Sequence, residues 1–113
     1  MQIAIVDFTT DIVVNTKYYF LAGATGSKLI GKVLAHVELQ VVTAGTTGPT
    51  TTALTRCAHA ATSNACSGAT VQMLSTNINV DSGTNSSADA GTPPVINTAN
   101  ATITTNQVIR VDI

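Results

Sequence analysis

The stretch GKVLAHVELQVVT, residues 31–43, carries the clearest strand signal in this sequence. Its apolar residues Val33, Ala35, Val37, Leu39 and Val41 alternate with Lys32, Leu34, His36, Glu38 and Gln40. A period of two residues is typical of a strand with one buried face, whereas a helix would scatter these apolar side chains around its surface. The β-branched side chains favour a strand as well. We therefore predict a half-buried strand over residues 31–43.

The end of the chain shows the same period. In VIRVDI, residues 108–113, the apolar Ile109, Val111 and Ile113 alternate with Arg110 and Asp112. Further apolar runs between turn residues are QIAIVDF, DIVVNTKYYFLAG, TTTALTR, GATVQMLSTNINVDSG and PVINTANATITTN. About seven or eight short strands predict an all-β fold, an antiparallel β-sandwich or jelly-roll-like barrel. A turn or two of helix is predicted only in ALTRCAHAATSNA, residues 53–65.

The domain organisation follows from length and from two unusual segments. A chain of 113 residues predicts a single domain over residues 1–113. Residues 1–11 are a candidate extended arm that adds an edge strand to a neighbouring molecule. The polar stretch DSGTNSSADAGTPP, residues 81–94, predicts a flexible loop. The candidate interface residues are Ile3, Ile5, Phe8, Tyr18 and Tyr19.

The composition excludes several classes of function. Charged residues make up only 10% of the chain, and the net charge is −1, so the surface lacks the charge that usually keeps a monomer soluble. We therefore expect other chains to cover part of it. The five Lys and Arg residues are scattered, which argues against nucleic-acid binding. Because no long apolar run and no basic leader occur, we expect neither a membrane span nor Sec export.

The segment CAHAATSNAC, residues 57–66, is the one stretch that suggests chemistry. A zinc site would need Cys57, Cys66, His59 and the distant His36 as its four ligands. A redox pair would have a Cys-x-x-Cys spacing, and a thiol nucleophile would need an orienting acid beside His59. We therefore expect no metal, no cofactor and no catalytic residue. A Cys57–Cys66 disulfide and two free thiols remain equal alternatives. Cytosolic proteins keep their thiols reduced, whereas the two cysteines of a protein released from the cell can be oxidised to a disulfide.

The stretches IGKVLAHVELQVVTAGTTGPTTTALTR and PPVINTANATITTNQVIRVDI, joined by a polar loop, resemble small structural proteins of tailed bacteriophages. The likeness is greatest to capsid decoration (cement) and head-fibre proteins and covers most of residues 29–113. The resemblance implies a β-sandwich or jelly roll, often a homotrimer, seated on the capsid exterior. Its partner would be the major capsid protein, whose neighbouring subunits it would clamp in a virion assembled in the host cytoplasm. Such families provide no active-site residues.

Two alternatives stay open. A tail-tube, baseplate or fibre subunit is a related structural role, and sequence alone does not place the protein on the particle. A small β-sandwich module that binds a glycan or a host surface is a different class of function. Such modules usually carry exposed aromatic or polar clusters on their loops. With only 4% aromatic residues, this chain favours the structural role over the binding module or an enzyme.

Overall fold

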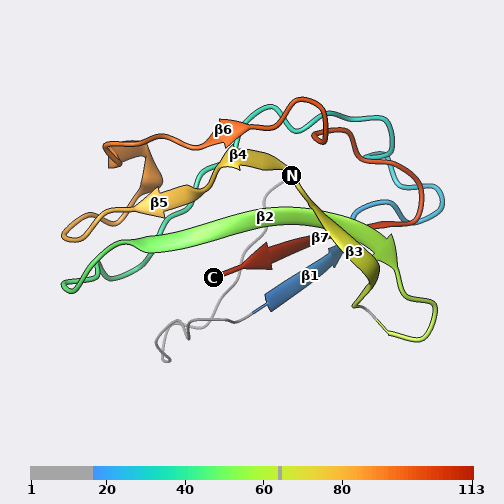
Figure 1. Ribbon diagram of the computed structural model, residues 1–113, viewed down its shortest axis with the longest axis horizontal. Coiled ribbons are helices and arrows are strands. Elements are labelled where there is room, and N and C mark those ends of the chain that lie inside the picture. Colours follow the sequence, from blue (N-terminus) through green and yellow to red (C-terminus); the bar gives the residue numbers. More distant parts are fainter. Residues whose placement is uncertain (1–16, 64) are drawn as a thin grey trace.

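Seven short strands and one 3-10 turn form the structure, a computed structural model that describes residues 17–63 and 65–113 (Figure 1). The strands are β1 (Lys17–Leu21), β2 (Thr50–His59), β3 (Cys66–Gln72), β4 (Leu74–Thr76), β5 (Ile78–Val80), β6 (Val95–Ile96) and β7 (Gln107–Asp112). The 3-10 turn η1 spans Ser87–Asp89. Every strand pair is antiparallel, so the predicted all-β antiparallel fold is confirmed.

The main sheet is built around β2. Its strand order is β1-β7-β2-β3, and β5 pairs with the start of β2. Residues 53–58 of β2 pair with β7, residues 55–59 pair with β3, and residues 50–52 pair with β5. The strand begins just after Gly48-Pro49, where Gly48 has a φ of 97° that a β-carbon would disfavour. This single ten-residue strand therefore holds three others in place.

The core lies between the main sheet and a second, less regular layer. From the sheet come Tyr18 and Phe20 of β1, Leu54 of β2, and Ile109 and Val111 of β7. The second layer contains the β4–β6 pair, which lies beside β2 in Figure 1, together with extended segments of the chain. Its core residues include Leu74, Ile96, Leu29, Leu34, Val37, Leu39 and Ile103. The predicted alternation in the last strand is confirmed, since Ile109 and Val111 are buried.

The strand predicted over residues 31–43 is wrong as a sheet strand. The segment forms only two isolated bridges, Val33 to Thr102 and Gln40 to Ser86. Val33 is 59% exposed, and Ala35 is exposed too, although both were predicted to be buried. The reason is that its partners are short: residues 101–103 accompany its beginning, and residues 85–87 accompany its end. An extended backbone is present, but no partner strand runs along its middle among the described residues.

The helical turn predicted in residues 53–65 is wrong as well. Residues up to His59 belong to β2 and continue its ladder with β7. Helix propensity is a weak preference that tertiary pairing overrides, and here a buried β7 supplies six paired residues. After β2 the chain turns and returns as β3, so the segment CAHAATSNAC is the tip of a β-hairpin.

Residues 81–94 have more internal structure than their polar composition suggested. The Asp81 carboxylate accepts a hydrogen bond from the Gly91 amide at 2.9 Å, which closes the loop on itself. Within it, the Ser86 hydroxyl accepts from the Ala88 amide and so caps η1. Ser86 and Ser87 are both buried. Local side-chain hydrogen bonds therefore replace apolar packing in this loop.

The packing predicts a large cost for truncating Met73. This side chain is fully buried at 0% exposure beside β2, where its amide donates to the Leu54 carbonyl. Met73→Ala should lower the free energy of unfolding by about 2–5 kcal/mol, measured by urea denaturation. The control Val42→Ala, at a side chain that is 74% exposed, should change it by less than about 0.5 kcal/mol. An unchanged urea midpoint for Met73→Ala would contradict this core.

Candidate functional site

A shallow pocket lies beside the middle of the extended segment 31–43. Its volume is about 230 Å³, and its lining residues are Ala35, His36, Val37, Glu38, Ser87, Ala88, Pro93, Pro94 and Ile96. Two hydrogen bonds fix η1 against the segment: the Ser87 amide donates to the Leu39 carbonyl, and the Leu39 amide donates to the Ser87 hydroxyl, both at 2.9 Å. The other wall comes from the two prolines before β6, which lack amide donors. The pocket is therefore mostly apolar.

The rim of the pocket is polar and centres on Glu38. The side-chain amide of Gln40 donates to its carboxylate at 3.2 Å, and the Ser86 hydroxyl donates at the same distance. The His36 ring nitrogen lies 3.7 Å from the other carboxylate oxygen. The hydrogen bond from Gln40, then those from Ser86 and His36, lower the pKa of Glu38 below its ordinary value. Glu38 is therefore ionised at neutral pH.

This arrangement suits binding and not bond-breaking chemistry. The two hydroxyls at the pocket are already engaged, since Ser86 donates to Glu38 and Ser87 accepts from the Leu39 amide. Neither is paired with His36 as a nucleophile would be. The His36 side chain is 81% exposed, so it lacks the enclosed environment of a catalytic base. What remains is an apolar recess with a negative rim, which fits an apolar side chain next to a cation.

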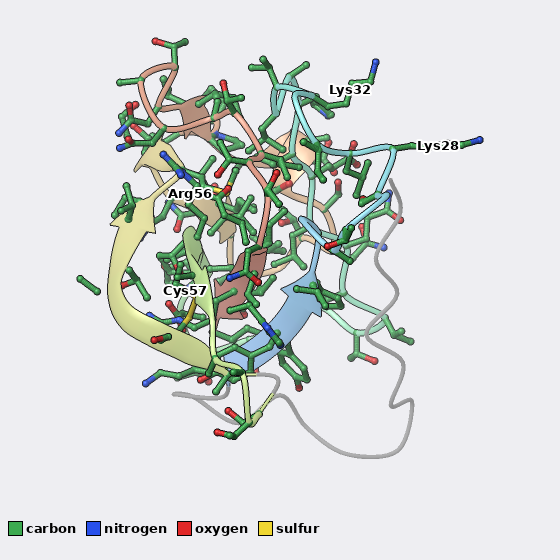
Figure 2. The ribbon with its side chains drawn as sticks, turned by 90° about the vertical axis from the view of Figure 1, so that its right-hand side faces the viewer. Lys28, Lys32, Arg56 and Cys57 are labelled. Carbon is green, nitrogen blue, oxygen red and sulfur yellow. A yellow bond between two sulfur atoms is a disulfide. The ribbon has the colours of Figure 1, made fainter. Side chains whose placement is uncertain are left out.

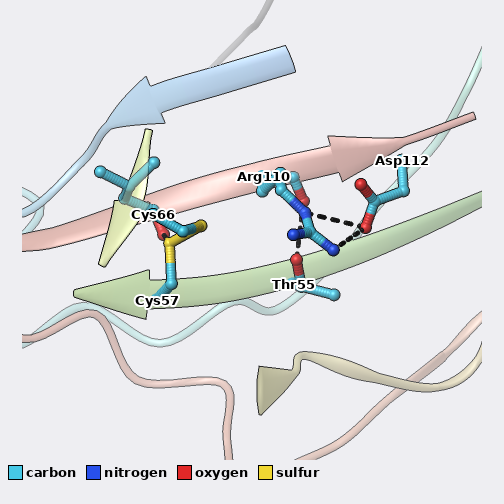
Figure 3. Close-up of polar contacts among 6 residues, drawn as sticks. Thr55, Cys57, Cys66, Arg110 and Asp112 are labelled. Carbon is cyan, nitrogen blue, oxygen red and sulfur yellow. Dashed lines mark hydrogen bonds and ion pairs between the residues drawn. A yellow bond between two sulfur atoms is a disulfide. The ribbon is translucent and has the colours of Figure 1, made fainter. Parts of the chain in front are cut away.

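The structure joins Cys57 and Cys66 in a disulfide between β2 and β3 (Figure 3). Their Cα atoms lie 5.5 Å apart, and Cys57 is buried at a β-bulge of β2. A disulfide sulfur is neither a thiolate ligand nor a nucleophile. The pair therefore clips the hairpin, and neither the zinc interpretation nor the thiol interpretation fits it. No group of three or more potential metal ligands occurs in residues 17–63 and 65–113.

The remaining candidate residues are distributed over the fold. Tyr18 packs against the core, and its neighbour Tyr19 is half-buried in the same strand, β1. His59 ends β2 opposite Cys66, and its backbone amide donates to the Asn106 carbonyl. Ile3, Ile5 and Phe8 belong to the predicted arm, residues 1–11, which lies outside the described residues. The structure thus brings none of the described candidates to the pocket except His36.

A second polar group lies on β7. The Arg110 guanidinium donates twice to one carboxylate oxygen of Asp112, at 2.6 and 3.0 Å (Figure 3). The Thr55 hydroxyl donates to the Arg110 carbonyl from the neighbouring β2. Both charged side chains are mostly buried, with 18% and 23% exposure. The two charges neutralise each other within the sheet, so this pair offers no net charge to a ligand.

No protein-family model, curated protein or solved structure matches the chain. Within the described part of the chain, no helix has the length and apolar character needed to cross a bilayer. The function must therefore be argued from the chain's own features.

Sequence reasoning missed most of the pocket. The sequence predicts Pro94 and Ile96 in a strand-forming run, and it predicts Ser86, Ser87 and Pro93 in the flexible loop 81–94. No local pattern relates them to residues 35–38, because the two parts of the pocket are about fifty residues apart in the chain. One available signal was the Ser86–Ala88 cap, since serine before a short turn is a capping pattern.

The Glu38 contacts predict a measurable change in its titration. Ser86→Ala removes one of the hydrogen bonds that favour the ionised form, so the pKa of Glu38 should rise toward its ordinary value of 4.5. The measurement is a pH titration of the Glu38 carboxyl carbon by NMR. Ser82→Ala is the control, because the Ser82 hydroxyl donates to the Gly45 carbonyl instead. Equal Glu38 pKa values in Ser86→Ala and the unaltered protein would contradict the assigned contact.

Proposed function

We propose that this protein is a structural subunit of a bacteriophage virion, and specifically a capsid decoration protein. In this role it binds the outer surface of the shell and stabilises neighbouring major capsid subunits. The resemblance of residues 29–113 to such proteins suggests the role, and the antiparallel all-β fold is compatible with it. The location on the capsid exterior belongs to the proposal on the resemblance alone, and the copy number is not part of it.

The observation that carries the proposal is a charge-poor surface with exposed large apolar side chains. Only 10% of the residues are charged, and two of these charges, Arg110 and Asp112, neutralise each other. At the same time Leu21, Val33, Val42, Val71 and Val95 are exposed. Surface charge usually keeps freely diffusing monomers from associating with one another, whereas a subunit in permanent contact with other chains needs little surface charge.

The disulfide supports the same proposal. Structural disulfides persist in oxidising surroundings and are uncommon in the cytosol. A virion protein is made in the host cytoplasm and then spends its working life outside the cell. A Cys57–Cys66 bond that forms after release would hold the β2–β3 hairpin closed on the particle. Weak individual contacts also suffice on a shell, because many copies bind one particle.

Co-expression with the major capsid protein encoded in the same genome tests this proposal. The chain should sediment with the assembled shells and raise the temperature at which they disrupt. The chain expressed alone is the control and should stay in the supernatant. A chain that remains soluble beside intact shells contradicts the decoration role. Co-sedimentation with tail tubes, or specific retention on a glycan array without shell binding, would instead favour the related tail role or the binding module.

A further inference from the structure

The segment with the strongest strand pattern in the sequence, residues 31–43, has no backbone partner along its middle among the described residues. Its backbone is hydrogen-bonded at both ends. Near the beginning the Leu34 amide donates to the Ala101 carbonyl, and near the end the Val41 amide donates to the Asn85 carbonyl, both at 2.9 Å. Between them, no described residue accepts a backbone hydrogen bond from the amides of residues 35–38. Extended backbone with free donors and acceptors is a template for another strand.

Geometry restricts how a second copy of this segment can pair with the first. Antiparallel pairs alternate between hydrogen-bonded and non-hydrogen-bonded types along the ladder. A two-fold axis makes the pair i:j the same type as the pair j:i. If a residue lay opposite the next residue of the other copy, two adjacent pairs would have the same type, which the alternation forbids, so one residue must lie opposite its own copy. Within residues 35–38, the axis can pass through Ala35, His36, Val37 or Glu38, and the flanking Leu34 gives one further register. Centring on Val37 pairs Ala35 with Leu39, whose amide and carbonyl already bond to Ser87. Centring on Glu38 places two carboxylates opposite each other, which is unfavourable.

The side chains favour the register centred on Ala35. There, Lys32 lies opposite Glu38 of the other copy, and Val33 lies opposite Val37. Centring on Leu34 places Lys32 opposite His36, and centring on His36 places Leu34 opposite Glu38. Neither of these registers places Lys32 opposite Glu38. Directly opposed residues of opposite charge stabilise an antiparallel pair, as do paired β-branched residues. The small Ala35 side chain suits the axis, where two copies of one residue meet.

We propose that residues 32–38 pair antiparallel with the same residues of a second copy, about a two-fold axis at Ala35. Val33, which is 59% exposed, then lies beside the partner's Val37, a wall of the apolar pocket. The pocket thereby receives an apolar side chain flanked by a lysine, the chemistry that its negative rim suits.

The charged partners of this contact are accessible. Figure 2 shows Lys32 and Lys28 extending away from the ribbon at one side of the molecule, and both residues are exposed. The Glu38 side chain is 39% exposed and lies at the pocket rim. The dimer contains two Lys32–Glu38 pairs, because the two-fold symmetry repeats every contact between the copies. Because Lys32 and Glu38 of the same short segment have opposite charges, a second copy of this segment is the partner that matches it.

This inference does not rest on the proposed function. It gives a dimer, whereas the resemblance to decoration proteins implies a trimer, so the copy number separates the two. A dimer that fails to bind shells leaves the pairing intact and refutes the decoration role. A monomeric protein that binds shells does the reverse.

Cysteine cross-linking of the full chain tests the register. The protein should sediment as a dimer at micromolar concentrations in analytical ultracentrifugation. Ala35→Cys should then form a covalent dimer under mild oxidation, because the two introduced sulfurs meet at the axis. Peptide mapping checks that Cys57 and Cys66 remain joined to each other. Val42→Cys is the control: its position is 74% exposed but outside the paired segment, so it should cross-link weakly.

Charge exchange tests the predicted pairs. Lys32→Glu should raise the dimer dissociation constant by about tenfold, since like charges replace both opposite pairs. The double variant Lys32→Glu with Glu38→Lys should restore it. Lys28→Glu is the matched control, with the same charge change outside the segment, and should leave the constant within about twofold. A monomer or trimer, a dimer that Ala35→Cys does not cross-link, or a double variant without recovery would each overturn the proposal.

Discussion

Strand β2 is the element on which the rest of the structure depends. Because β7 and β3 overlap along its second half, they must occupy its two opposite edges, while β5 pairs with its first three residues. The remaining strand of the main sheet, β1, is joined to β2 through β7, which is its only partner strand among the described residues. The disulfide joins β2 to β3 and holds this part of the ladder in register, while the Arg110–Asp112 pair lies within β7.

The inner face of the main sheet is covered largely by parts of the chain that lie outside its strands. The β4–β6 pair is too short to do so alone, and irregular segments supply the rest through Leu29, Leu34, Leu39 and Ile103. Such segments satisfy their backbone groups with isolated bridges and with serine caps, as at Ser86 and Ser87. The cost is an extended segment whose middle, residues 35–38, has no backbone partner among the described residues. This middle lines one side of the pocket and is the part of the chain that the proposed two-fold contact uses.

The sequence pattern predicted extended backbone well but did not predict which segments pair. The alternation in residues 108–113 corresponds to β7, because β7 has partners on both sides. The clearer alternation in residues 31–43 does not give a sheet strand, because pairing needs a neighbour that no local pattern specifies. In residues 53–65, the local preference for helix lost to the ladder with β7. The pocket was out of reach for the same reason, since its two walls are far apart in the chain.

The central claim is that the backbone of residues 35–38, which has no partner among the described residues of one chain, becomes paired in a dimer. Amide hydrogen exchange at several protein concentrations measures this most directly. At low concentration these four amides should exchange rapidly, while the amides of β2 and β7 stay protected. At high concentration, protection should appear at Ala35 and Val37, whose amides face the open edge opposite to the one that Leu34 presents to Ala101, and the exposed 45–48 turn should stay unchanged. Protection of residues 35–38 that is the same at every concentration would contradict the account, because their partner would then lie within the chain itself.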